Sequence, residues 1–487
     1  MKVFVTGITG LVGRALALRL AREGHEVVGW VRDVAAARMV LSDEVTLLGT
    51  NEGDTALGRA LSEADAVVNL AGAPVARRWS RGYRRALVSS RVGLTTRLVD
   101  TMRSLDRRPA VLLSASAVGY YGDRGDERLD EDASAGEGFL ARLCVDWENA
   151  AREAEALGVR VATLRIGIVL DSEGGAVATM RPAFGLGLGA VLGSGRQYCP
   201  FIHLADLVEL LVRGLSDSRY TGPINAVAPQ PIDNRTFTRE LAAALSRPAW
   251  FRAPAFVLRL AMGKAAQIML ASQRVVPRRL LELGFPFAYP RVGPALRDVA
   301  DAGRRTVQMR SATEEAPSVA YLDARRPRYV LEQHTTIEAP LSDVAEFFAR
   351  AENLGAITPP TLAFEIRTPT PIAMERGRLI DYRIRLGGVP MRWQTRIEHW
   401  APGERFIDVQ LRGPYRAWYH EHLFEADGDR TLMVDRVYYA PPLGPLGRIA
   451  HWMFVGRTLR RVFGYRRIAI DRRFGVIEPS TSGSATT

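Results

Sequence analysis

The sequence predicts two modules of different fold class, an α/β domain followed by an α+β domain. Strands alternate with helices over the first 300 residues, which is typical of a doubly wound parallel sheet covered by helices on both faces. From Arg328 the pattern changes to one helix, a run of alternating strands and a long closing helix. Between the modules, residues 306–327 are polar and lack periodicity, so we expect a linker there. The length of 487 residues agrees with at least two domains.

The first module opens with the elements strand, loop, helix and strand. Val3–Thr6 is a short apolar run, and a periodic helix follows and ends at Gly24. Glu26–Val31 is the second strand. Later apolar runs at 66–70, 110–113 and 159–164 continue the alternation. Apolar stretches at 201–215 and 237–245 and a helical stretch at 255–283 predict a smaller lobe over about 170–300 within a domain of residues 1–305.

The second module is expected over residues 328–475. Glu332–Ile337 alternates, and a helix follows Pro340. Further strand-like runs lie at 380–386, 391–399, 405–411, 420–425 and 431–438, before an amphipathic segment at about 445–473. The Ser/Thr-rich residues 476–487 are expected to form a disordered tail.

Composition excludes several classes of protein. Hydrophobic residues make up 47% and charged residues 24%, which is ordinary for a globular chain. The net charge of +12 is spread along the chain, whereas a nucleic-acid binder concentrates it on one face or arm. No apolar run is long enough for a transmembrane segment, and no signal peptide is recognised. Cys144 and Cys199 form no disulfide framework, which favours a reducing, cytoplasmic location.

A glycine-rich loop predicts a dinucleotide site. Gly7, Gly10 and Gly13 lie directly between the first strand and the first helix. The first glycine permits a tight turn, the second a close approach to a pyrophosphate, and the third close packing of helix on strand. The helix N-terminus then offers its partial positive charge to the phosphates. This context indicates a Rossmann nucleotide-binding domain.

The end of the second strand indicates which cofactor is bound. An NAD site has a carboxylate there for the ribose 2′-hydroxyl, but the position is Val31 and the next residue is Arg32. A guanidinium suits the 2′-phosphate of NADP. Asp33 follows at once and leaves NAD as the less favoured alternative.

Several segments extend the pattern beyond the loop: Thr6–Gly13, Asn69–Gly72, Ser114–Gly122, Cys144–Glu148, Gly193–Gln197, Ile202–Leu207 and Ser272–Val275. In this order they resemble the atypical, epimerase-like short-chain dehydrogenase/reductases of the sugar-nucleotide epimerase-related family, over about residues 1–300. The resemblance implies a Rossmann domain with a small C-terminal lobe and bound NADP. It also implies cofactor contacts from Thr9, Leu11, Val12, Ala71 and Gly72 beside the three glycines.

The expected active site departs from the family pattern. Ordinary members use a serine and a Tyr-x-x-x-Lys pair, in which tyrosine is the acid/base and lysine lowers its pKa. The resemblance places this pair at Leu140 and Cys144, and the only lysines, Lys2 and Lys264, lie elsewhere. Ordinary dehydrogenase chemistry therefore cannot apply unchanged.

The remaining candidates lie on the loop after the strand that contains Ser116. We expect Ser116 and Tyr120 to be the catalytic residues, with Tyr121 as a neighbouring alternative acid. Cys144 is more typical of a small buried hydrophobe than of a thiol acid/base. Arg196 is the candidate for holding an anionic group of the substrate.

Two further pairs on the first module have structural interpretations. Asp146 and Glu148 share one helix turn with Arg142, and a surface ion pair is the expected interpretation. His203 with Asp206 is expected to position a helix rather than to act in catalysis.

The second module carries a resemblance of its own. Its segments are Ala351–Leu354, Ile357–Pro360, Gly413–Tyr415 and Pro441–Gly447. They resemble the START-like polyketide-cyclase/lipid-transport superfamily, over about residues 328–474. The resemblance implies a helix-grip fold, in which a curved antiparallel sheet wraps a long C-terminal helix around an apolar cavity.

Polar residues of this module have competing interpretations. His420 and His422 lie on one face of a strand, a spacing that permits a metal ion, but no third ligand is evident and no metal is predicted. Arginines of the last helix, including Arg466 and Arg467, are expected on a solvated face, with contact to anionic lipid as the alternative.

The leading interpretation is an NADP-dependent epimerase or oxidoreductase-like enzyme that acts on an unidentified small molecule and is fused to a module for an apolar ligand. The alternative is a non-catalytic, NADP-responsive binding or regulatory protein, which the missing Tyr-x-x-x-Lys pair supports. A third interpretation is a regulator that acts at a membrane surface or in cell division.

Overall fold

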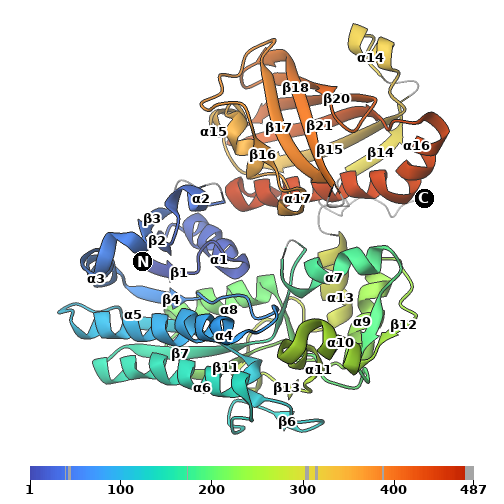
Figure 1. The fold of residues 1–487 in the computed structure, drawn as a ribbon. Coiled ribbons are helices and arrows are strands. Elements are labelled where there is room, and N and C mark those ends of the chain that lie inside the picture. The colour runs from blue at the N-terminus through green and yellow to red at the C-terminus, as the bar shows by residue number, and fades with distance from the viewer. Residues whose placement is uncertain are drawn as a thin grey trace, which may run out of the picture. The chain divides into compact units, whose positions relative to one another are not determined.

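The computed structural model describes residues 1–38, 40–41, 45–172, 174–301, 307–312, 316–386 and 389–477. The chain divides into two compact units, Met1–Ala300 and Asp301–Thr487 (Figure 1). Each unit has a main sheet and hydrophobic clusters of its own. No described helix is both long enough and apolar enough to cross a membrane.

A seven-stranded parallel sheet organises the first unit, in the order β3-β2-β1-β4-β5-β7-β11. Its strands are β1 (Lys2–Thr6), β2 (Glu26–Val31), β3 (Thr46–Gly49), β4 (Ala66–Asn69), β5 (Val111–Ala117), β7 (Arg160–Ile166) and β11 (Gly222–Ala226). The strand order reverses between β1 and β4, where Thr6 pairs with Trp30 on one side and Asn69 on the other. Ligands of open α/β sheets bind beyond the strand ends at such a switch point.

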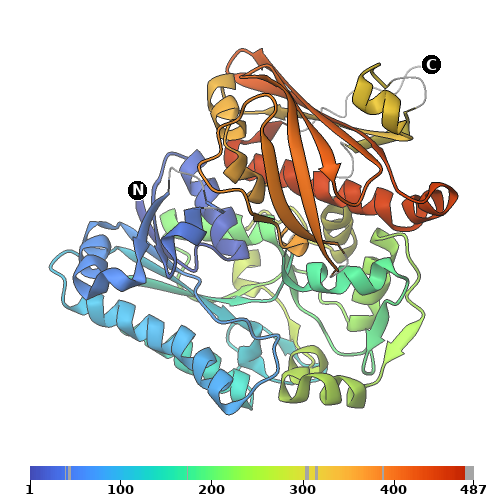
Figure 2. The same cartoon turned by 45° about the horizontal axis from the view of Figure 1, so that its top comes forward.

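Helices cover both faces of this sheet, as the alternation of strands and helices predicts (Figures 1 and 2). Val3 and Val5 point to α1 (Leu11–Arg22) and α8 (Leu204–Ser216). Phe4 points to the opposite face, where it joins the cluster formed by α3 (Gly53–Glu63), α5 (Leu94–Arg103) and the end of α6 (Phe139–Arg152). Because both faces are buried, the strands read as continuous apolar runs.

The smaller lobe packs around α7 (Gly175–Gly185), α9 (Asn234–Ala244) and α13 (Val292–Asp301). The prediction of one continuous helical stretch over 255–283 is wrong. It is divided into α10 (Ala255–Met262), α11 (Gln267–Leu270) and α12 (Arg278–Glu282), with the two-residue strand β13 (Arg274–Val275) between the last two. Gly263 ends α10 with a φ of +60°, and Pro277 precedes α12, so both residues interrupt the helix.

An antiparallel sheet organises the described part of the second unit, in the order β14-β15-β21-β20-β19-β18-β17-β16, with β22 also paired to β15. The strands are β14 (Val307–Ser311), β15 (Tyr329–Ile337), β16 (Glu365–Ile366), β17 (Leu379–Leu386), β18 (Val389–Ala401), β19 (Arg405–Arg412), β20 (Ala417–Asp427), β21 (Arg430–Ala440) and β22 (Val476–Ile477). The helices α15 (Leu341–Phe348), α16 (Gly444–Ala450) and α17 (Gly456–Phe474) complete it. Leu459 and Phe463 of α17 pack against Leu331 and Val437 of the sheet. Figure 2 shows the long C-terminal helix lying along one face of the antiparallel sheet.

The predicted linker over 306–327 is wrong in part. Strand β14 pairs with β15 from Val307 opposite Gln333 to Ser311 opposite Tyr329. Helix α14 (Ala320–Arg325) buries Tyr321, whose hydroxyl donates to the carbonyl of Gln410 at 2.7 Å. An edge strand held by backbone hydrogen bonds needs few apolar residues, so composition does not reveal it.

The predicted tail over 476–487 is also wrong at its start. Val476 and Ile477 form β22 and pair with Ile337 and Thr336 of β15. Residues 478–487 of the tail lie outside the described residues, as do residues 306 and 313–315 of the predicted linker.

Candidate functional site

The glycine loop leaves no room for side chains between β1 and α1. A Cβ on Gly7, whose φ is +67°, would lie 2.8 Å from the backbone of Leu70 and Ala71. A Cβ on Gly13 would lie 2.4 Å from the carbonyl oxygen of Gly7. Gly10 is the N-cap of α1, and no side chain caps it. The first turn of α1 therefore presents backbone N–H groups, which suit an anionic ligand.

A buried hydrogen-bond chain fixes the end of β4 beside this loop. The Thr6 hydroxyl donates to Asn69 Oδ1 at 2.7 Å, and the Asn69 amide donates to the Thr95 hydroxyl at 2.8 Å. The Ala71 N–H donates to Thr6 Oγ1 at 3.3 Å. The Trp147 indole N–H also donates to Thr95, at 3.0 Å. These bonds hold the segment that begins at Asn69 against β1, as a rigid cofactor site requires.

The end of β2 offers a cation rather than a free carboxylate. Arg32 is exposed directly after the buried Val31. The Asp33 carboxylate accepts a hydrogen bond from the Ala36 N–H at 2.9 Å and so caps the short helix α2 (Val34–Arg38). A second cation, Arg14, lies in the first turn of α1, and its Nε is buried without a hydrogen-bond partner among the described residues. Sequence reasoning overlooked Arg14, although it directly follows the third glycine.

Ser116 belongs to a closed polar network. It is 3% exposed, and its hydroxyl donates to Glu148 Oε1 at 2.7 Å. Arg165 of β7 grips the same carboxylate with two N–H groups, at 2.9 and 3.0 Å. Burial by itself lowers the pKa of Arg165, but the bonds and charge of Glu148 raise it above its ordinary value. The expected surface ion pair of Glu148 with Arg142 is wrong, because Glu148 is 2% exposed and faces the sheet.

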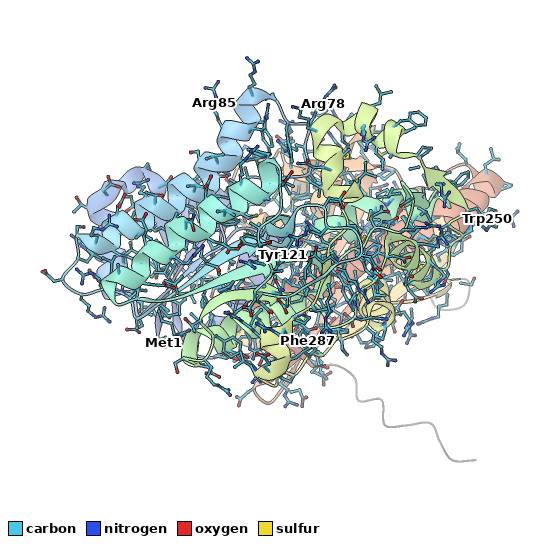
Figure 3. The ribbon with its side chains drawn as sticks, turned by 90° about the horizontal axis from the view of Figure 1, so that it is seen from below. Met1, Arg78, Arg85, Tyr121, Trp250 and Phe287 are labelled. Atoms are coloured by element: carbon cyan, nitrogen blue, oxygen red, sulfur yellow. The ribbon has the colours of Figure 1, made fainter. Side chains whose placement is uncertain are left out.

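Arg165 extends this network to both candidate tyrosines. Its Nη1 donates to the Tyr121 hydroxyl at 2.9 Å, and its guanidinium carbon lies 3.5 Å from the ring centroid of Tyr120. The Tyr121 hydroxyl also lies 2.7 Å from Asn225 Oδ1. Burial raises the pKa of Tyr121 to about 12, which makes it a weak acid at neutral pH. Figure 3 shows Tyr121 in the interior of the unit, in contrast to the exposed Trp250.

Leu140 and Cys144, where the family resemblance places the Tyr-x-x-x-Lys pair, are packing residues. A Cβ on Gly119 would lie 3.6 Å from Leu140 Cβ and 3.8 Å from Cys144 Sγ, so both side chains pack under the turn that contains Gly119. Cys144 is 4% exposed. Burial, together with the charge of Glu148, raises its pKa to about 12. Cys144 is thus a small buried hydrophobe, as the sequence indicates.

Arg91 is a partly buried cation that sequence reasoning missed. Its Nη2 donates to the carbonyl of Ala73 at 2.9 Å, and a Cβ on Gly72 would lie 3.0 Å from its guanidinium carbon. Its Nη1 is buried and has no hydrogen-bond partner among the described residues. Burial lowers its pKa. One sequence pattern could have revealed it. Arg91 lies at helical spacing from Leu87 and Thr95, which are both fully buried, so Arg91 shares their face of the helix.

Two further candidates lie in or beside the small lobe. Arg196 is exposed, and its backbone N–H donates to the Ser194 hydroxyl at 3.2 Å. His203 is the N-cap of α8, and its Nδ1 accepts from the Ala205 N–H at 3.2 Å. Asp206 accepts two backbone N–H bonds from residues 288 and 289. The prediction that His203 and Asp206 position a helix is confirmed.

The second unit encloses a cavity of about 180 Å³ between its sheet, α15 and α17. Aromatic and aliphatic side chains form most of its wall, including Phe348, Ile380, Trp393, Phe406, Trp418 and Phe463. Such a wall suits an apolar ligand.

One end of this cavity is polar. His420 and His422 are buried on β20, and β19 supplies Asp408 as the third donor that sequence reasoning did not find. Arg466 of α17 is 6% exposed and lies 3.0 Å from Asp435, so the expected solvated position of Arg466 is wrong. Burial, reinforced by the neighbouring His422, lowers the pKa of His420 to about 4.

The first unit has the fold and glycine loop of a nucleotide-binding epimerase/dehydratase domain. Residues 3–225 match the NAD dependent epimerase/dehydratase family, and residues 253–299 match a domain of unknown function, DUF1731. Neither model reaches the second unit. The chain belongs to the epimerase family that includes the SDR39U1 proteins.

Relatives in three kingdoms support this membership. The chain is 39% identical over 303 residues to the chloroplastic SDR39U1 homolog of Arabidopsis thaliana, which covers 61% of this chain and 86% of that protein. It is 41% identical over 296 residues to an epimerase family protein of Mycobacterium bovis, covering 60% and 96%. Human SDR39U1 is 34% identical over 304 residues, covering 61% and 99%.

Solved structures agree with these sequence relatives. The crystal structure of human SDR39U1 isoform 2 with NADPH superposes with a TM-score of 0.56 at 32% identity, covering 62% of this chain and 99% of that one. A nucleoside-diphosphate sugar epimerase from Corynebacterium glutamicum gives a TM-score of 0.50 at 33% identity, covering 62% and 58%.

Proposed function

We propose that the first unit binds NADP(H), with the phosphates on the loop from Gly7 to Gly13 and the 2′-phosphate at Arg32. The observation that carries this proposal is the position of Asp33, whose carboxylate caps α2 and leaves Arg32 as the charge at the end of β2. The NADPH in the human SDR39U1 structure supports it. Ala71 and Gly72 complete the site from the end of β4.

The residues of this chain favour an epimerase or oxidoreductase of atypical mechanism. Bound NADP would supply the hydride chemistry. Arg196 would hold an anionic group of a small substrate. Ser116 lies near the end of β5 and Tyr120 in the turn that follows it. Tyr120 is the better candidate for the proton donor, because the Ser116 hydroxyl already donates to Glu148. Arg91 supplies a partly buried positive charge beside Gly72, in place of the missing lysine.

A second candidate function is a non-catalytic protein that responds to NADP(H). The closed network favours it: Ser116 already donates to Glu148, and burial raises the pKa of both Tyr121 and Cys144 to about 12. No acid in this set matches neutral pH. In such a protein, cofactor binding would change a surface or a partner rather than turn over a substrate.

Titration calorimetry with NADPH and NADH tests the cofactor. NADPH should bind more tightly, and Arg32→Ala should lose about 1–3 kcal/mol of NADPH affinity, or roughly 5- to 150-fold, with NADH unaffected. Arg59→Ala is the matched control, because Arg59 is an exposed arginine on α3. Equal affinities of the unmutated protein for the two cofactors would contradict the proposal.

Single-turnover oxidation of bound NADPH across a panel of carbonyl compounds separates the two functions. An enzyme should show slow turnover that falls by about 10²–10⁴ in the Ser116→Ala, Tyr120→Phe double variant. Turnover that survives the double variant shows that other residues transfer the proton. A protein without turnover on the panel favours the NADP-responsive function.

For the second unit we propose a START-like, helix-grip module that binds an apolar ligand. The antiparallel sheet packed on α17 and the cavity of about 180 Å³ support this proposal. Native mass spectrometry of freshly purified protein should show a co-purifying lipid-like molecule. A Phe463→Arg variant, which places a charge in the cavity wall, should lose it.

A further inference from the structure

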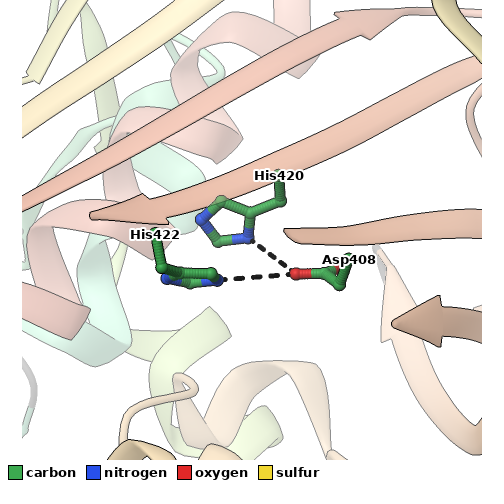
Figure 4. A group of neighbouring side chains, drawn as sticks. All are labelled: Asp408, His420 and His422. Carbon is green, nitrogen blue, oxygen red and sulfur yellow. Dashed lines mark ion pairs between the residues drawn. The ribbon is translucent and has the colours of Figure 1, made fainter. Parts of the chain in front are cut away.

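Three donor side chains meet at the polar end of the cavity in the second unit. Asp408 of β19 pairs directly with His420 of β20, and His422 lies two residues further along the same face. Asp408 Oδ2 lies 3.4 Å from His420 Nδ1 and 3.5 Å from His422 Nε2 (Figure 4). The three donor atoms lie within 4.8 Å of one another.

A second carboxylate lies on the other side of both rings. Asp435 Oδ1 lies 2.7 Å from His422 Nδ1 and 3.2 Å from His420 Nε2. At these distances the carboxylate can accept an N–H from each ring. Arg466 holds Asp435 in place through an ion pair at 3.0 Å. Arg466 Nη2 also approaches His422 Nδ1, at 3.2 Å, but the carboxylate oxygen is nearer.

The other nitrogen of each ring faces Asp408 Oδ2, so two imidazole nitrogens and one carboxylate oxygen converge on a single point. A metal ion can take all three atoms as ligands. The chain supplies the usual outer partner as well, because a carboxylate that accepts the second N–H of a histidine is the common support of a metal-binding imidazole.

We propose that Asp408, His420 and His422 bind a divalent first-row transition metal ion, Zn²⁺ or Fe²⁺, at the polar end of this cavity. The spacing agrees, because bonds of about 2.0–2.1 Å in a tetrahedral site place ligand atoms about 3.3 Å apart. Two imidazoles and one carboxylate favour these metals over Mg²⁺ and Ca²⁺, which take oxygen ligands.

The surroundings assign this ion a ligand-binding role. Three protein donors leave coordination positions open, whereas structural zinc sites are closed by four. Phe406 stacks on His422 with ring centroids 3.9 Å apart, and Phe463 meets the His420 ring edge-on at 5.5 Å. These contacts hold both rings and form part of the apolar cavity wall. The open positions suit an apolar molecule that carries one oxygen donor, such as a carboxylate or enolate.

Titration calorimetry of the tag-free, full-length chain, stripped with EDTA, tests the proposal with Zn²⁺ as the probe. One Zn²⁺ should bind per chain, and Mg²⁺ should not compete. Asp408→Asn and His422→Gln should each weaken binding by about 100-fold or more. The matched control is His399→Gln, because His399 is an exposed histidine on the neighbouring strand β18.

Two further measurements keep the test independent of folding. Circular dichroism and thermal melting should show that Asp408→Asn is folded. X-ray absorption of the zinc-loaded wild type should report two imidazoles with additional oxygen donors. The proposal is overturned if the wild type binds no Zn²⁺, if the control loses binding as the site variants do, or if the bound ion has no imidazole ligands.

Discussion

Each unit buries a charged cluster, but the two clusters are composed differently. In the first unit, Ser116 and two N–H groups of Arg165 donate to Glu148, and a third N–H of Arg165 donates to Tyr121. In the second unit, two imidazoles lie between two carboxylates, Asp408 and Asp435. A network of satisfied hydrogen bonds rigidifies a core, whereas two converging imidazoles with a carboxylate are a common ligand set for a transition metal.

The two clusters also differ in the chemistry that they allow. In the first unit, the expected catalytic residue Ser116 donates to Glu148, and Leu140 and Cys144, where the family resemblance places the Tyr-x-x-x-Lys pair, pack under the turn that contains Gly119. In the enzymatic function proposed above, proton transfer would therefore fall to Tyr120. In the second unit, by contrast, side chains of types that bind metal ions lie beside an apolar cavity: Asp408, His420 and His422.

The largest expected effect is the loss of the closed network. Arg165→Met leaves Glu148 buried without its cation, and we expect the first unit to lose about 3–5 kcal/mol of stability. The Arg165→Met, Glu148→Gln double variant should recover part of this loss, because it removes the unpaired charge. Urea unfolding measures both. A loss below about 1 kcal/mol in the single variant would show that the network is not closed in solution.

Zinc should stabilise the second unit alone. At a free Zn²⁺ concentration of 100 times Kd, the expected gain is about 2.7 kcal/mol. Hydrogen exchange followed by mass spectrometry can show which unit is stabilised. Exchange should slow in peptides from β19, β20 and β21 and stay unchanged in peptides from β5. Equal slowing in both units would point to nonspecific binding.

Replacing the serines of β5 should have a smaller effect on stability, and one serine serves as the control for the other. Ser116→Ala removes a 2.7 Å hydrogen bond to a buried carboxylate and should cost about 1.5–3 kcal/mol. Ser114 is equally buried, but its bonds are 3.3 and 3.4 Å long, so Ser114→Ala should cost less than about 1 kcal/mol. Urea unfolding ranks the two variants, and the reverse order would contradict the role given to Glu148.

The smallest expected effect is a gain in stability. Gly58 lies inside α3, and an added Cβ would meet its nearest neighbour at 3.8 Å. Gly58→Ala should therefore stabilise the first unit by about 0.5–1 kcal/mol, since alanine loses less backbone entropy in a helix. Hydrogen exchange should slow in peptides of the first unit and stay unchanged in β20 and β21. A change in both units would show that their stabilities are coupled.

Local patterns predicted much of the fold and little of the polar chemistry. The strand, glycine loop and helix around Gly7 and Gly13 are consecutive in the chain, so spacing alone reveals them. The pairing of Glu148 with Arg165 joins α6 to β7, and that of His420 with Asp408 joins two strands. Nothing in the local sequence indicates which buried charged residues pair with each other.

The sequence by itself determined the two fold classes, the nucleotide loop and the cation at the end of β2, because each depends on periodicity or on neighbours within a few residues. Only the tertiary structure decided that β14 belongs to the second unit, that Ser116 donates to Glu148, and that Asp408 completes a donor set with two histidines. These features depend on side chains and strands that meet only when sheets and helices pack, and packing selects partners by geometry rather than by distance along the chain.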